Sequence, residues 1–181
     1  MLDGSGDSNT ENKLRWSEML KFVAKATEEF DQDNTRFGVV KFGSTPKVVV
    51  NLTQTDDLLS VRDKILSEKF PGGERTINDA LKVAWKDLFK NNKRTTSKVI
   101  AALTTGNLPY GPWGSSLFLT NRKIRIMAFG VDKAPTYRYL ESLASGKHPE
   151  NIYSLDTEQF ERALPFIAKD ICTGTLPCYY L

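Results

Sequence analysis

Apolar residues recur at helical spacing in several stretches of the chain. Between residues 11 and 30 they fall every three or four positions, with charged residues between them, which predicts an amphipathic helix. Its apolar side consists of Trp16, Met19, Leu20, Val23, Thr27 and Phe30. Further helices are predicted at 55–69, 77–89, 137–144 and 157–172. Thr55 is expected to cap the first of these, and Pro165 to kink or restart the last.

Short β-branched or wholly apolar runs alternate with these helices. Residues 36–42 and 47–52 flank a Gly-Ser-Thr-Pro turn and predict an antiparallel hairpin. The runs at 98–103 and 123–131 are almost wholly apolar, as in strands covered on both faces, and 151–155 predicts a further strand. The alternation predicts an α/β fold: a Rossmann-like three-layer sandwich with a mainly parallel central sheet, one antiparallel edge strand and helices on both faces. A binding site is expected at the carboxyl ends of the strands.

Composition narrows the classes of function. A chain of 181 residues, of which 40% are apolar, is long enough for one globular domain with a substantial core. A net charge of +3 is too small to indicate a nucleic-acid partner, and no apolar run is long enough for membrane insertion. We expect one domain at 1–172 and a C-terminal tail at 173–181.

Oxygen-bearing side chains alternate near the start of the chain. Asp3, Ser5 and Asp7 are separated by single glycines, so these side chains can converge while the backbone bends beneath them. Oxygen ligands without His or Cys favour a hard cation such as Mg²⁺ or Ca²⁺ over zinc. The alternative is an ordinary turn-rich segment, since Gly, Asp and Ser are also common in turns.

Four stretches taken together resemble the von Willebrand factor A or integrin I domain family, namely DGSGD, GGERTINDAL, KVIAALTTG and KIRIMAFGV, in this order. The resemblance implies a metal-ion-dependent adhesion site, in which Asp3 and Ser5 match the first two positions and Thr76 matches the Thr that reaches the metal. Asp7 stands where the family has Ser, and Thr105 where it has the Asp that holds a metal-bound water. The resemblance therefore implies a departed site that binds Mg²⁺ or Ca²⁺ weakly or not at all.

The resemblance also implies a truncated first strand. In the family this strand is central and runs for several residues ahead of the first site Asp, whereas only Met1 and Leu2 precede Asp3 here. We expect either that the sequence is a fragment or that another segment fills this position, because a missing central strand leaves backbone groups of both neighbours unpaired.

Two further features are compatible with a secreted glycoprotein. A disulfide bond between Cys172 and Cys178 is feasible across the five intervening residues, which include Gly and Pro. Asn51-Leu52-Thr53 is a glycosylation sequon, which makes Asn51 a candidate site. Both assignments are expectations that the spacing allows.

The motifs of enzymes are missing from the sequence. It has no nucleotide-binding loop or nucleophile motif, and its single His leaves few general-base mechanisms. The resemblance implies a non-enzymatic, extracellular cell-adhesion or protein-binding module whose partner is a protein of the matrix or of a cell surface. Its expected contact residues are Leu108, Tyr110 and Trp113 beside the metal-site residues, since aromatic side chains carry much interface energy.

Two alternatives to this function stay open. One is an intracellular A-domain scaffold in a protein complex. The other is an α/β phosphate-binding enzyme that uses Asp3 and the Gly72-Gly73 loop at a helix start. The sequence leaves the oligomeric state open as well.

Overall fold

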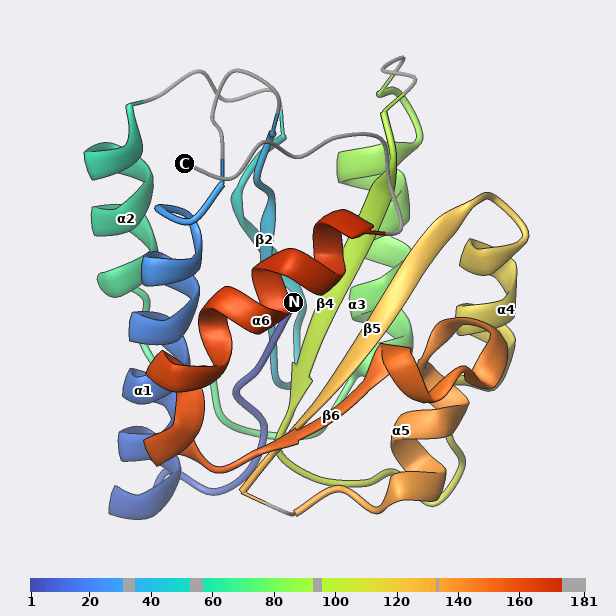
Figure 1. Cartoon of the computed structure of the whole chain (residues 1–181). Helices are drawn as coiled ribbons and strands as arrows, with labels where there is room; N and C mark the ends of the chain where they lie inside the picture. The colour runs from blue at the N-terminus through green and yellow to red at the C-terminus, as the bar shows by residue number, and fades with distance from the viewer. Residues whose placement is uncertain (31–34, 53–56, 93–95, 133, 174–181) are drawn as a thin grey trace.

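A six-stranded sheet forms the centre of the computed structural model, which describes residues 1–30, 35–52, 57–92, 96–132 and 134–173. Its strand order is β3-β2-β1-β4-β5-β6 (Figure 1). Neighbouring strands are parallel except for β2 and β3, so β3 is an antiparallel edge strand. The predicted fold class is therefore confirmed.

The elements follow the predicted order. The strands are β1 (Leu2–Asp3), β2 (Val39–Phe42), β3 (Lys47–Val50), β4 (Lys98–Thr104), β5 (Ile124–Val131) and β6 (Ile152–Leu155). The α-helices are α1 (Thr10–Ala26), α2 (Leu58–Leu66), α3 (Ile77–Val83), α4 (Trp113–Thr120), α5 (Tyr137–Leu143) and α6 (Phe160–Thr173). A π-helical stretch, η1 (Ala84–Phe89), continues α3, so the two together cover the helix predicted at 77–89.

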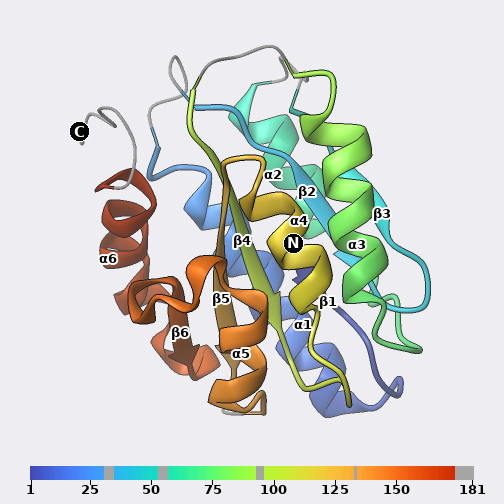
Figure 2. The ribbon, with the colours of Figure 1, turned by 90° about the vertical axis from the view of Figure 1, so that its right-hand side faces the viewer.

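Helices cover both faces of the sheet, as Figure 2 shows. β5 is buried from both sides because its side chains alternate: Ile126 and Ala128 belong to the core shared with α3, α4 and α5. Met127 and Phe129 belong to the core shared with α1, α2 and α6. A strand that is apolar on both faces therefore needs a helix layer on each side.

Three local predictions differ from the structure. α4 was not predicted, because the sequence Gly-Pro-Trp-Gly-Ser-Ser is typical of a loop. A tertiary hydrogen bond anchors this helix: Ser116 Oγ donates to the Leu143 carbonyl at 2.6 Å. α2 is capped by Asp57, whose side chain accepts from the Ser60 amide, whereas Thr55 lies outside the described residues. α6 runs through Pro165 without a restart.

The space between β2 and β4 ahead of β1 is a cavity. β1 pairs with its neighbours over only two residues, so Lys98–Ile100 pair with β5 alone. None of the described residues fills this space as a strand, and the cavity measures about 560 Å³. Its apolar lining includes Phe22, Phe30, Phe37, Val99, Ala101 and Ile167.

Met1 extends the parallel ladder toward this cavity. Its nitrogen donates to the Ala101 carbonyl at 2.6 Å, and its carbonyl accepts from the Leu103 amide at 3.0 Å. Burial lowers the pKa of the Met1 amino group from 8.0 to about 5. Because the unfolded chain then binds a proton that the folded chain excludes, this group makes folding less favourable as the pH falls from 8.0 to about 5.

Adding about four β-branched apolar residues ahead of Met1 should raise the melting temperature, because a strand of that length would lie in the cavity and pair with β4. The matched control is a Gly/Ser extension of equal length, which replaces the amine by an amide but offers no apolar side chains. Thermal melts at pH 8 and pH 5 should show the Met1-dependent loss of stability in the 181-residue chain alone. Equal melting temperatures for the two extensions would show that the cavity does not accept a strand.

Candidate functional site

Three segments meet at the carboxyl ends of β1 and β4, and we call them the rim: residues 3–7, 71–76 and 104–107. A short antiparallel bridge joins the first two segments. Gly6 N donates to Gly73 O at 2.8 Å, and Gly73 N donates to Gly6 O at 3.0 Å. Their φ angles of 111° and 78° are rarely adopted by residues with a side chain, so glycine is required at both.

The carboxylate of Asp3 is the centre of the rim. It is 0% exposed. Its Oδ1 accepts from Ser5 N at 3.0 Å and from Ser5 Oγ at 2.6 Å. Its Oδ2 accepts from Thr104 Oγ1 at 2.8 Å, Thr105 N at 3.0 Å and Arg75 Nε at 2.7 Å. These donors outnumber the roughly four lone-pair positions of a carboxylate, so Asp3 is fully hydrogen-bonded by the chain itself.

Arg75 links all three segments of the rim. Besides its ion pair with Asp3, it donates from Nη1 to Asn107 O at 3.1 Å and from Nη2 to Thr105 Oγ1 at 3.3 Å. Its guanidinium packs against Gly106, where an added Cβ would lie only 2.8 Å from Nη2. The side chain is 17% exposed, so this cation is largely enclosed by the rim.

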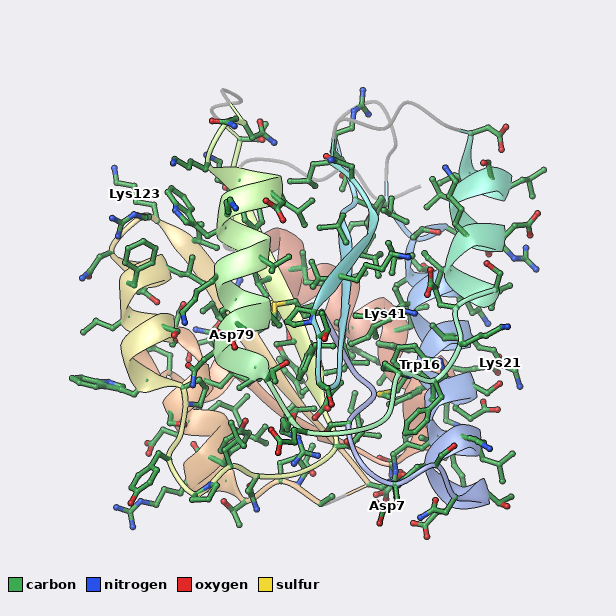
Figure 3. All side chains as sticks on the ribbon, turned by 180° about the vertical axis from the view of Figure 1, so that it is seen from behind. Asp7, Trp16, Lys21, Lys41, Asp79 and Lys123 are labelled. Carbon is green, nitrogen blue, oxygen red and sulfur yellow. The ribbon has the colours of Figure 1, made fainter. Side chains whose placement is uncertain are left out.

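The predicted metal ligands are only partly brought together. Ser5 is hydrogen-bonded to Asp3. The Thr105 amide donates to Asp3, and the Thr105 hydroxyl accepts from Arg75. Thr76 instead precedes α3 and donates from Oγ1 to Gly43 O at 2.5 Å. Asp7 is exposed and lies at the lower edge of the molecule in Figure 3. No hydrogen bond between described residues joins Asp7 or Thr76 to Asp3.

A buried phenol lies next to the ion pair. Among the described residues the Tyr139 hydroxyl has no hydrogen-bond partner. Burial raises the pKa of Tyr139, the nearby Asp3 charge raises it further, and the Arg75 charge opposes that rise. Tyr139 is therefore neutral at physiological pH.

A second ion pair fixes the end of β5. Asp132 accepts from Arg15 Nε at 2.7 Å and from Thr157 N at 2.9 Å. Burial alone would raise the pKa of Asp132, but the hydrogen bonds from Arg15 and Thr157 outweigh it and hold the pKa below its ordinary value. The pair joins α1 to the turn that precedes α6.

Exposed aromatic side chains lie on the loop that follows the 104–107 segment of the rim and on α4 and α5. Tyr110 is 88% exposed and Trp113 57%, so both predicted contact residues are accessible, while Leu108 is half-buried against the core. Leu117 lies one turn after Trp113 on α4 and is also exposed. Tyr137, at the start of α5, is 58% exposed and was not among the predicted contact residues.

The loop that carries Tyr110 is held against α5. Asn107 Oδ1 accepts from the Thr136 amide at 2.8 Å, and an added Cβ at Gly111 would collide with Ser142. We use the name aromatic surface for the exposed side chains of Tyr110, Trp113 and Tyr137, together with Leu117, which lies one turn after Trp113 on α4.

The remaining predicted sites lie away from the rim. Asn51 is exposed after β3, and Thr53 of its sequon lies outside the described residues. Cys172 is in the last turn of α6; its side chain and the whole of Cys178 lie outside what the structure describes. Glycosylation and the disulfide bond stay predictions.

The fold agrees with a comparison against known protein families. The family model of the von Willebrand factor type A domain matches residues 1–166. The chain belongs to this family. One curated relative, von Willebrand factor A domain-containing protein 2 of Xenopus laevis, is 23% identical over 179 residues. That match covers 97% of this chain and 22% of the relative.

Solved structures show the same fold. Proximal thread matrix protein 1 from the mussel byssus matches with a TM-score of 0.79 and 21% identity, over 93% of this chain and 44% of that one. In another structure of the mussel protein, zinc occupies the MIDAS motif, the metal-ion-dependent adhesion site, and the TM-score is 0.75. Manganese-loaded TRAP protein of Plasmodium vivax matches with a TM-score of 0.74 and 17% identity, over 94% of this chain and 70% of that one. Metal is therefore held by structural neighbours of this chain.

The rim of this chain does not fit a divalent cation in the same way. Asp3 has no lone pair left for a metal, because Ser5, Thr104, Thr105 and Arg75 use them all. A positive guanidinium already lies against the Asp3 carboxylate and repels a second cation.

Arg75 is the site residue that sequence reasoning missed. It directly precedes Thr76, in a loop already expected to reach the rim. The available signal was the loss of an acid at position 105, which leaves room for a basic side chain beside Asp3.

Replacing Gly106 with Ala should destabilise the protein by about 1–3 kcal/mol, because the new methyl group would push the Arg75 guanidinium away from Asp3. The matched control is Gly114→Ala on α4, where an added Cβ meets nothing within 4 Å. That control should be neutral or stabilising by up to about 1 kcal/mol, because Ala favours a helix. Urea unfolding of both variants gives the comparison, and equal effects would contradict the tight packing of Arg75.

Proposed function

We propose that this chain is a non-enzymatic protein-binding module of the extracellular space, which binds a matrix or cell-surface protein at the rim and the aromatic surface. The observation that carries the proposal is the exposure of Tyr110, Trp113 and Tyr137. Tyr110 and Tyr137 lie close to Asn107 of the rim, through the chain and through the hydrogen bond from Thr136. Aromatic side chains with this exposure are enriched at protein interfaces and dominate their energetics.

The aromatic surface is suited to binding because its supports are rigid. Trp113 lies on α4, Tyr137 on α5, and the Tyr110 loop is tied to α5 through Asn107. A surface that is already ordered loses little conformational entropy when a partner binds. The adjoining rim is ordered by the Asp3–Arg75 ion pair, so both parts of the proposed interface are preformed.

The phosphate-binding alternative loses its main support. Phosphate loops bind anions through backbone N–H groups that point at the ligand. Here Gly72 N donates to Gly4 O, Gly73 N to Gly6 O, and Glu74 N to Ser44 Oγ. The loop therefore uses these donors within the chain.

Two observations support the extracellular location. Asn51 is exposed where a glycan would need access. The mussel structural neighbour is named as a thread matrix protein. No helix within the described residues is long and apolar enough to cross a membrane.

Changing both Tyr110 and Trp113 to Ser should weaken partner binding at least about 30-fold, since a single hot-spot side chain contributes about 2 kcal/mol or more. The control is Phe166→Ser, which removes an aromatic side chain that is 71% exposed on α6, in the other helix layer. A partner identified from matrix extracts would be titrated against the three proteins by surface plasmon resonance. Loss of binding in the Phe166 variant alone would move the interface to α6.

A further inference from the structure

We propose that Arg75 takes the place of a divalent cation in this domain, so that the rim is assembled by a side chain of the protein and works without metal. The metal-free rim is a property of the folded chain itself. Only its consequence for ligand binding, insensitivity to chelators, rests on the function proposed above.

Oxygen atoms from two segments surround the guanidinium of Arg75. Arg75 collects Asp3 Oδ2 from the end of β1, and Thr105 Oγ1 and Asn107 O from the loop after β4. These oxygens come from two different segments and converge on one positive group. A metal ion would join the same segments by accepting their lone pairs, and Arg75 joins them with N–H donors instead.

The charge of Arg75 also compensates the buried charge of Asp3. Asp3 is 0% exposed, and an ionised carboxylate in such a place requires a compensating positive charge or strong hydrogen bonds. Arg75 supplies both at 2.7 Å. A divalent ion at this position would have to displace the guanidinium, which is protonated at all physiological pH values.

The pocket in which the guanidinium lies also fits its planar shape. Gly106 leaves a flat space that the planar group fills, with its Cζ only 3.0 Å from where a Cβ would be. Lys would bring the same charge but lacks the planar fork with several fixed donors. The rim is therefore shaped for Arg and not merely for any positive side chain.

The direct test is a titration of the unmodified protein with Mn²⁺, followed by electron paramagnetic resonance, together with thermal melts in Mg²⁺, Ca²⁺ or EDTA. We expect no binding of Mn²⁺ at micromolar concentration and no change in melting temperature between the metal and EDTA conditions. Micromolar Mn²⁺ binding, or a melting temperature that falls in EDTA, would overturn the proposal.

A pair of variants isolates Arg75 from the other departures of the site. Asp7→Ser with Thr105→Asp restores the family residues at both positions but keeps Arg75, and we expect it to bind no Mn²⁺. Adding Arg75→Ser to this pair removes the cation, and we expect Mn²⁺ binding together with a melting temperature that rises in Mg²⁺. If the pair that retains Arg75 binds as tightly as the triple variant, Arg75 does not hold the metal position.

Two further measurements keep the result interpretable. Should the triple variant fail to fold without metal, refolding in Mg²⁺ but not in EDTA still supports the proposal, and failure in both overturns it. Arg75→Lys retains the charge, and we expect it to melt lower than the unmodified protein yet still exclude Mn²⁺; Mn²⁺ binding by this variant would also count against the proposal.

The link to ligand binding is tested separately. Binding of an identified protein partner should be the same in EDTA and in Mg²⁺. A partner that dissociates in EDTA would overturn metal-independent binding. If no partner is found at the rim, the proposed function fails, while the Mn²⁺ titration still decides whether Arg75 replaces the metal.

Discussion

The buried carboxylate of Asp3 is the constraint on which the rim depends. A charged group that is wholly removed from water is tolerated only when donors and a countercharge surround it. Ser5, Thr104, Thr105 and Arg75 meet this requirement, and each comes from a segment that must therefore stay close to the end of β1. The conformation of the rim loops follows from this need more than from their own preferences.

The position of Asp3 in turn depends on a very short central strand. β1 is held by β2 on one side and β4 on the other, although it contributes only Leu2 and Asp3 to the sheet. Pairing on both edges compensates for the lack of length at the rim. At the opposite end a cavity lined by Val99 and Ala101 lies between β2 and β4, so within the described residues the sheet is more fully paired at the rim than at this end.

The family relationship explains the shape of the rim but not its chemistry. Structural neighbours of the same fold are described with zinc or manganese. In this chain an Arg side chain stands against the first site Asp, and the predicted ligands Thr76 and Asp7 are engaged elsewhere or exposed. Under the proposal made above, the fold keeps its loops while the guanidinium of Arg75 takes the position of the metal ion beside Asp3.

The sequence by itself determined the α/β class, the helix layers on both faces of a mainly parallel sheet and the segments that meet at the rim, because apolar periodicity is a local property that each stretch carries. The order of the strands in the sheet came from the tertiary structure. It also indicated that Asp3 and Ser5 belong together and that Tyr110 and Trp113 are accessible. Only the tertiary structure decided that α4 is a helix, since Ser116 needs the distant Leu143 carbonyl to anchor it. The tertiary structure likewise decided the role of Arg75, for which the missing acid at position 105 was only an indirect signal. This role arises because 72 positions of chain separate Arg75 from Asp3, and only folding brings the two charges to 2.7 Å in a place without water.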